Sequence, residues 1–185
     1  MRPEPTADFV WPRPGPDTLS VIQGDVRVSR DPRIVMSTLV GSCVSVCLFD
    51  PDLGLGGMNH YLLPGDPDQQ DQDGALYGIN QIELLINELM KEGAVRSHLQ
   101  AKIFGGNRMM DGLTTVGERN ARVAEEFIRD EGIRLVASQL RGDRAQKIEF
   151  HPASGRARTR YVEEVVVEVA PRPAPVMDAG DVDFF

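Results

Sequence analysis

Several features that mark particular protein classes are missing from this 185-residue sequence. Basic residues are a minority, with 20 Lys and Arg against 28 Asp and Glu, and the formal net charge of -8 excludes the positive surface of a general nucleic-acid-binding protein. No stretch approaches the run of about 18 apolar residues that a membrane-spanning helix needs. Prolines interrupt the first residues, MRPEPTADFVWPRPGP, where a signal peptide would need an apolar run. We therefore expect a cytoplasmic protein.

Cysteine is scarce, since the chain has only Cys43 and Cys47. On a strand, four positions correspond to about 13 Å at about 3.3 Å per residue. That separation is too large for a disulfide, whose Cα atoms lie within about 7 Å, and for both sulfurs to bind one zinc ion at about 2.3 Å. We therefore expect no disulfide and no metal site, and a chain of this length buries enough surface to fold without either.

Proline is concentrated at the two ends of the chain. Five prolines fall within residues 1–18, and three more open the segment 171–185. Neither segment has enough clustered apolar residues to offset the entropy of ordering, so both are predicted to be flexible tails. Residues 19–170 between them are predicted to form one folded domain, as expected at about 100–200 residues per domain.

The body of the chain mixes two hydrophobic periodicities. Short runs rich in β-branched residues predict strands. These runs are residues 19–28, 33–40, 43–49, 55–63, 101–104, 133–139, 145–151 and 156–169. The last two flank the turn sequence PASG and are predicted to form a hairpin.

Two longer stretches have helical periodicity. Residues 74–92 carry one apolar stripe and stop at Gly93, and residues 116–131 follow a capping-box pattern, Thr115-x-x-Glu118. The stripe comprises Leu76, Ile79, Ile82, Ile86, Leu89 and Met90. Because the strands outnumber the helices and do not alternate regularly with them, the predicted fold class is α+β.

The surroundings of the two cysteines differ. Cys47 lies among apolar residues and is predicted to be a small buried side chain. Cys43 follows Gly41 and Ser42, at the point where one predicted strand gives way to the next. A turn there can present the thiol beside free backbone N–H groups, which stabilise a thiolate and an oxyanion. Cys43 is therefore a candidate nucleophile.

His60 is the candidate base. If strands 43–49 and 55–63 pair as a hairpin around residues 50–54, His60 lies opposite Cys43 or Val44, where an imidazole can take the thiol proton. A buried structural histidine is the alternative, and the register leaves both readings open.

The hydroxyl groups of Ser37 and Thr38 lie just upstream of the candidate nucleophile. Either can orient an imidazole as a third member of a catalytic triad, although ordinary strand polarity explains them equally well. Further along, Gly105-Gly106 follows a predicted strand without a nucleotide-binding motif. It predicts a tight turn whose N–H groups can line the site.

Several stretches together resemble the CheD family, the chemoreceptor glutamine deamidases of bacterial and archaeal chemotaxis. The first are residues 37–51 (STLVGSCVSVCLFDP) and 57–64 (GMNHYLLP). The resemblance continues through residues 101–107 (AKIFGGN), 117–120 (GERN) and 142–150 (GDRAQKIEF), and so spans roughly residues 20–165. It implies a three-layer α/β sandwich similar to the deamidase domain of cytotoxic necrotizing factor toxins.

The resemblance also implies a role for each candidate residue. The family's Cys is the nucleophile and its His is the general base and acid, which corresponds to Cys43 and His60 here. The family's third residue is a Thr six positions before the Cys. That position is Ser37 in this chain, with Thr38 one step further on, so the spacing favours Ser37.

The implied activity is hydrolysis of glutamine side-chain amides in methyl-accepting chemotaxis receptors, without a cofactor, through a thioester. The new glutamates can then be methylated. A CheC-type phosphatase is a further implied partner. The alternative is a non-catalytic module that docks on receptors or on such a phosphatase. A cysteine peptidase or transglutaminase shares the Cys–His pair and is excluded only by the resemblance.

Overall fold

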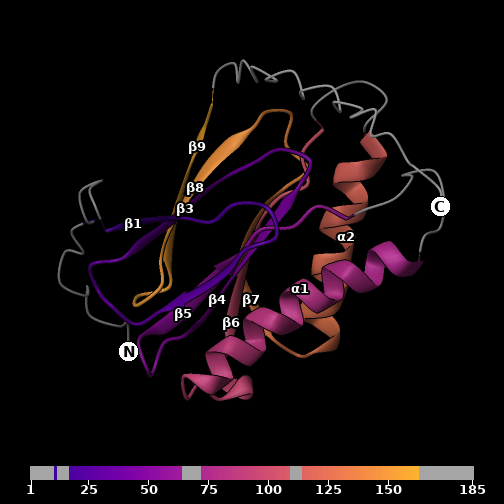
Figure 1. Cartoon of the computed structure of the whole chain (residues 1–185). Coiled ribbons are helices and arrows are strands. Elements are labelled where there is room, and N and C mark those ends of the chain that lie inside the picture. The colour runs from indigo at the N-terminus through magenta and orange to yellow at the C-terminus, as the bar shows by residue number, and fades with distance from the viewer. Residues whose placement is uncertain (1–10, 12–16, 64–71, 109–113, 163–185) are drawn as a thin grey trace, which may run out of the picture.

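The computed structural model describes residue 11 and residues 17–63, 72–108 and 114–162 (Figure 1). Two β-sheets and two α-helices make up this part of the chain, which confirms the α+β class. The predicted tails, 1–18 and 171–185, lie outside it, apart from Trp11, Asp17 and Thr18. Within the described ranges, no helix is long and apolar enough to cross a membrane.

The larger sheet has five strands and contains the candidate hairpin. Its order is β2 (Val26–Ser29), β5 (Leu55–Asn59), β4 (Val44–Asp50), β6 (Gln100–Gly105) and β7 (Arg134–Leu140). Neighbouring strands are antiparallel except β6 and β7. The central strand β4 is buried along its whole length. Its two polar residues, Ser45 and Asp50, are hydrogen-bonded to the backbone. β4 and β5 pair around the turn that follows Asp50, which confirms the predicted hairpin.

The smaller sheet has four strands in the order β1 (Thr18–Ser20), β3 (Val35–Val40), β8 (Gln146–His151) and β9 (Arg156–Tyr161). The predicted hairpin of the last two strands is present. The predicted strand 19–28 is instead two strands in different sheets. Gly24, with a φ of 90°, turns the chain between them and donates its N–H to the His60 carbonyl (2.8 Å).

Apolar side chains from both sheets form one core between them. The smaller sheet and the segment after β1 contribute Val21, Met36, Val40, Ile148 and Phe150, and the larger sheet contributes Cys47, Phe49, Met58 and Phe104. The rings of Phe49 and Phe150 meet at 6.5 Å between centroids. The burial predicted for Cys47 is confirmed, because its side chain is 0% exposed.

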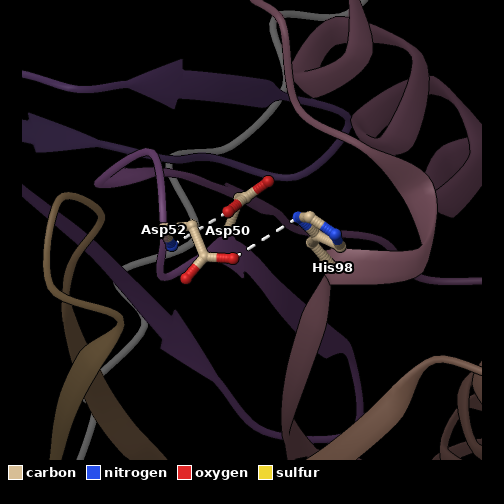
Figure 2. A group of neighbouring side chains, drawn as sticks. All are labelled: Asp50, Asp52 and His98. Carbon is tan, nitrogen blue, oxygen red and sulfur yellow. Dashed lines mark hydrogen bonds and ion pairs between the residues drawn. The ribbon is translucent and has the colours of Figure 1, made fainter.

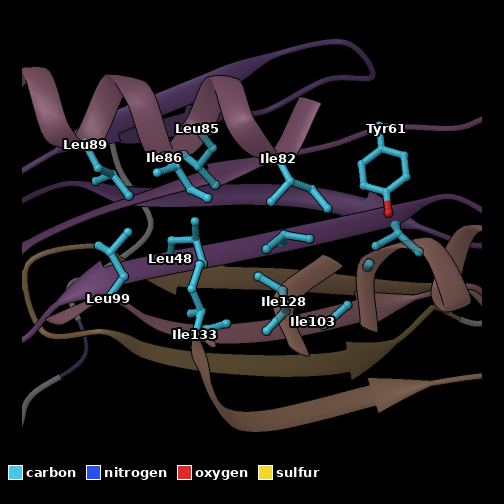
Figure 3. Close-up of a cluster of buried hydrophobic side chains, with 14 of the residues drawn as sticks. Leu48, Tyr61, Ile82, Leu85, Ile86, Leu89, Leu99, Ile103, Ile128 and Ile133 are labelled. Atoms are coloured by element: carbon cyan, nitrogen blue, oxygen red, sulfur yellow. The ribbon is translucent and has the colours of Figure 1, made fainter. Parts of the chain in front are cut away.

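Helices α1 (Gln72–Lys91) and α2 (Thr114–Asp130) cover the other face of the five-stranded sheet (Figures 1 and 3). A short 3-10 helix, η1 (Arg96–His98), precedes β6. The buried stripe of α1 consists of Ile82, Leu85, Ile86 and Leu89.

Two predictions for the helices are wrong, one for the buried face of α1 and one for the start of α2. Leu76 and Met90 are 54% and 43% exposed, because they lie off the buried face of α1; Leu89, next to Met90, is fully buried. In α2, Thr115 lies inside the helix and the Glu118 carboxylate pairs with Arg141, so the predicted capping box is wrong.

Candidate active site

The Cys43 turn, residues 41–43, carries the chain from β3 in one sheet to β4 in the other. Each of its three carbonyl groups accepts a hydrogen bond from a distant part of the chain. The donors are the Asn107 N–H to Gly41 (2.8 Å), Asn120 Nδ2 to Ser42 (3.1 Å) and the Gly106 N–H to Cys43 (2.8 Å). The turn is therefore fixed through its carbonyl side, and its shape does not depend on the Cys43 side chain.

Glycine is needed where β6 meets this turn. Gly105 has a φ of 104°, and a Cβ there would lie 2.2 Å from the Cys43 carbonyl oxygen. No other residue type fits that approach. Gly105 and Gly106 both have positive φ, and the Gly106 N–H donates to the carbonyl of Cys43.

The Cys43 thiol is partly exposed, whereas Cys47 is buried. Burial raises the pKa of Cys43 above 9.0, and hydrogen bonds from the backbone of Gly41 and of Cys43 itself act in the opposite direction. The thiol is protonated at neutral pH and needs a base to become a nucleophile.

His60 follows β5 and turns toward the smaller sheet. Its Nδ1 lies 2.9 Å from Thr38 Oγ1 and 3.4 Å from the Val21 carbonyl oxygen. Its Nε2 is buried and has no hydrogen-bond partner in the part of the chain that the structure describes. A proton on Nδ1, directed at the Val21 carbonyl or the Thr38 hydroxyl, leaves the Nε2 lone pair available to accept another proton.

The predicted register of His60 is wrong by one residue or more. Val44 and Tyr61 form the bridged pair, with two N–H···O bonds of 2.9 Å, so His60 lies opposite Ser45. The cause is the turn: Asp50 pairs with Leu55, so the loop is residues 51–54 and the hairpin is centred half a residue later than predicted.

The pairing nevertheless brings Cys43 and His60 to one face of the hairpin. Val44 and Tyr61 both enter the core under the helices, so the residues before them point to the other face. Cys43 packs there, against the core between the sheets. In antiparallel pairing the two residues are diagonal neighbours, and Cα atoms in such pairs are about 7–8 Å apart, within reach of long side chains.

Burial also determines the charge of the base. It lowers the pKa of His60 below 6.5, and the Val21 hydrogen bond and the Asp25 charge act against it. His60 is therefore neutral at pH 7. A neutral thiol and a neutral imidazole require general-base catalysis, in which the proton moves as the sulfur attacks.

Of the two candidate hydroxyls, the structure brings Thr38 to His60 and places Ser37 elsewhere. Alternate strand residues point to opposite faces, and Thr38 shares its face with the core residues Met36 and Val40. Ser37 points to the outer face of the smaller sheet. It lines a cavity of about 750 Å³ there with Leu39 and Lys147, a cavity that Thr38 also borders. The spacing that favoured Ser37 is therefore not matched by this geometry.

Comparison with known proteins gives the family. The family model for CheD chemotactic sensory transduction matches residues 62–161. A protein from Caulobacter sp. (strain K31), named probable chemoreceptor glutamine deamidase CheD, is 50% identical over 171 residues, which cover 89% of this chain and 91% of the relative. The chain belongs to the CheD family. A relative of the same name from Agrobacterium fabrum (strain C58) is 47% identical and covers 89% of this chain and 94% of its own.

The comparisons do not identify the residues of the site. The CheD match begins at residue 62, after His60, so the roles of Cys43 and His60 do not follow from it. Among solved structures, the hypothetical protein YfiH of Bacillus licheniformis superposes with a TM-score of 0.41 and 15% identity, over 64% of this chain and 51% of that one. That likeness is too weak to support an argument about the fold.

One group of potential metal ligands lies away from Cys43. Oxygen and nitrogen atoms of Asp50, Asp52 and His98 lie within 4.8 Å of one another (Figure 2). The Asp50 carboxylate already accepts the N–H groups of Asp52 (3.0 Å), Leu53 (3.2 Å) and, through its other oxygen, Val95 (3.4 Å). These bonds explain the cluster in this CheD chain as a brace for the β4–β5 turn.

The sequence interpretation did not select Asn107 and Asn120, although both occur in the stretches that resemble CheD. Both are 0% exposed and both contribute to the fixed turn. The only signal in the sequence is their position, because each is the last residue of a stretch that resembles CheD, AKIFGGN and GERN.

Replacement of Gly105 tests the close approach. Gly105→Ala adds a methyl group against the Cys43 carbonyl and also strains the backbone, and we expect it to lower the free energy of unfolding by at least about 2 kcal/mol in urea denaturation. Gly24→Ala is the matched control, because Gly24 also has a positive φ but an added Cβ meets nothing within 4 Å. Equal losses in the two variants would show that only backbone strain matters.

Proposed function

We propose that this chain is a chemoreceptor glutamine deamidase that uses Cys43 as the nucleophile, His60 as general base and acid, and Thr38 to orient His60. One observation carries the proposal: the buried imidazole of His60 has Nδ1 held by Thr38 and Nε2 without a partner among the described residues, on the hairpin face where Cys43 lies. The CheD relatives carry the name of this activity.

Acylation begins when the Cys43 sulfur attacks the carboxamide carbon of the substrate glutamine. The thiol proton moves to Nε2 of His60 as the sulfur–carbon bond forms, and the carbonyl oxygen becomes an oxyanion. Backbone N–H groups of the turn that carries Cys43 are the proposed donors for that oxyanion. When the tetrahedral intermediate collapses, His60 gives its proton to the departing nitrogen and ammonia leaves a thioester behind.

Deacylation reverses the roles. His60, neutral again, takes a proton from a water molecule as the water oxygen attacks the thioester carbon. The sulfur–carbon bond breaks, the sulfur regains a proton from His60, and the product is glutamate. Every proton in the cycle passes through one imidazole nitrogen, so the orientation of that ring matters more than its basicity.

The remaining expectations belong to the same proposal. They are a folded domain over residues 19–170 with flexible ends, a three-layer sandwich similar to the cytotoxic necrotizing factor deamidase domain, and a location in the cytoplasm. The two sheets with helices over one face are compatible with such layers. Docking on a CheC-type phosphatase stays a prediction from the family resemblance.

Deamidation is tested with the two cysteines as a matched pair. Purified protein is incubated with a chemoreceptor cytoplasmic fragment, and released ammonia and the mass change from Gln to Glu are measured. We expect wild type and Cys47→Ala to be active, with Cys47→Ala losing only about 1 kcal/mol of stability from a small cavity, and Cys43→Ala to be inactive. Receptor binding without ammonia release by the wild type would instead indicate a docking module.

The hydroxyl that orients His60 is tested by Thr38→Ala and Ser37→Ala. Loss of the Thr38 contact frees the imidazole to rotate, so we expect kcat to fall by at least about 10-fold with the fold intact. Ser37→Ala should stay within about twofold of wild type, because Ser37 faces the opposite side of the strand. A larger loss from Ser37→Ala, with both variants folded, would contradict the assignment to Thr38.

A further inference from the structure

Asn120 lies in α2, fully buried, beside the turn that carries Cys43. Its Nδ2 donates to the Ser42 carbonyl (3.1 Å) and to the Val116 carbonyl (2.8 Å). Its Oδ1 accepts the Leu63 N–H (2.8 Å). Both hydrogens and the oxygen of one carboxamide are therefore used, each on a different backbone group.

These bonds join the two segments that carry the reacting side chains. Ser42 directly precedes Cys43, and Leu63 follows His60 by three residues. A further bond acts in the same place, because the buried Tyr61 hydroxyl donates to the backbone carbonyl of Asn120 (3.1 Å). A single helical residue thus holds the nucleophile turn and the segment of the base at a fixed separation.

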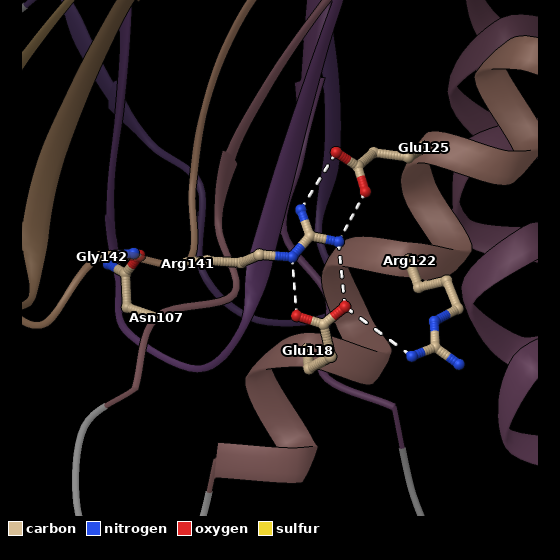
Figure 4. A network of polar contacts seen from close by, with 6 residues as sticks. All are labelled: Asn107, Glu118, Arg122, Glu125, Arg141 and Gly142. Carbon is tan, nitrogen blue, oxygen red and sulfur yellow. Dashed lines mark hydrogen bonds and ion pairs between the residues drawn. The ribbon is translucent and has the colours of Figure 1, made fainter.

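The helix that presents Asn120 is itself anchored. Arg141 donates to the carboxylates of Glu118 and Glu125, through four hydrogen bonds between 2.6 and 3.1 Å (Figure 4). Arg141 has a φ of 61°, and the next residue, Gly142, donates its N–H to Asn107 Oδ1 (2.9 Å). The loop that begins with Asn107 is consequently tied to α2 through Arg141.

Close backbone packing removes the remaining freedom. A Cβ at Gly117 would lie 2.6 Å from the Asn107 carbonyl oxygen and 2.7 Å from that of Gly106. The first turns of α2 therefore pack directly on the Gly106–Asn107 backbone, whose N–H groups hold the Cys43 turn. Helix and turn are positioned against each other from two sides.

We propose that Asn120 is a positioning residue for the deamidation, which sets the distance between the Cys43 sulfur and His60 Nε2. This role rests on the proposed function, because it matters only if a proton passes between those atoms. The residue type follows from the contacts: a short side chain must offer two donors and an acceptor in one plane, which only a carboxamide does. A misplacement of about 1 Å at such a pair can cost about 100-fold in rate.

The test compares Asn120→Ala with Gln146→Ala. Gln146 is the matched control, because its carboxamide is also buried, at 1% exposed, and Nε2 donates to a backbone carbonyl, that of Gln139 (3.2 Å). That bond touches neither the Cys43 turn nor the His60 segment. Three quantities are measured for each variant: kcat and KM on a receptor cytoplasmic fragment, the rate of Cys43 alkylation by iodoacetamide, and thermal unfolding.

We expect both variants to lose thermal stability, but only Asn120→Ala to lose kcat and Cys43 alkylation rate, each by at least about 10-fold, with KM within about twofold. Equal losses in the two variants, or wild-type kcat and alkylation in folded Asn120→Ala, would overturn the proposal. If Asn120→Ala does not fold, Asn120→Asp, which keeps the acceptor for Leu63, replaces it at a pH where the new carboxyl is ionised. A wild type without deamidase activity would contradict the proposed function. The alkylation rates of the variants could still be compared with wild type, because alkylation needs no receptor.

Discussion

The rest of the site depends on how the chain satisfies the carbonyl groups of residues 41–43. A backbone carbonyl that is shielded from water needs a hydrogen bond, and the carbonyl groups of this turn find their donors in other parts of the chain. Gly106 and Asn107, which follow β6, and Asn120 of α2 supply the three donors. In the proposed mechanism, the N–H groups of the same turn serve the oxyanion.

Burial determines the charge states of the Cys43 thiol and the His60 imidazole. It raises the pKa of Cys43 and lowers that of His60, so both side chains are neutral at pH 7. A stable thiolate–imidazolium pair would need charges that the site does not stabilise in the resting state. In the proposed mechanism the proton therefore moves during the attack. The Nδ1 contacts with Thr38 and Val21 leave Nε2 to receive it.

The sequence predicted what depends on local patterns. The strands, both helices, the β4–β5 hairpin and the two candidate residues follow from periodicity, turn composition and spacing. The choice of Thr38 over Ser37 did not, because it depends on which face of β3 looks toward the second sheet. The position of His60 was wrong because the register depends on the exact centre of the β4–β5 turn. Asn120 was missed because its partners are 57 and 78 residues away in the chain.

The central claim is that His60 acts as a base on a thiol that does not ionise by itself, and the pH dependence of Cys43 alkylation tests it most directly. Rates of reaction with iodoacetamide are measured for wild type and His60→Ala. In wild type the rate should reach a plateau that begins below pH 6.5, because the lowered pKa of His60 makes the base available there. In His60→Ala it should be slower at neutral pH and keep rising beyond pH 9.0, since the thiol must ionise unaided. The same profile in both proteins would contradict the account.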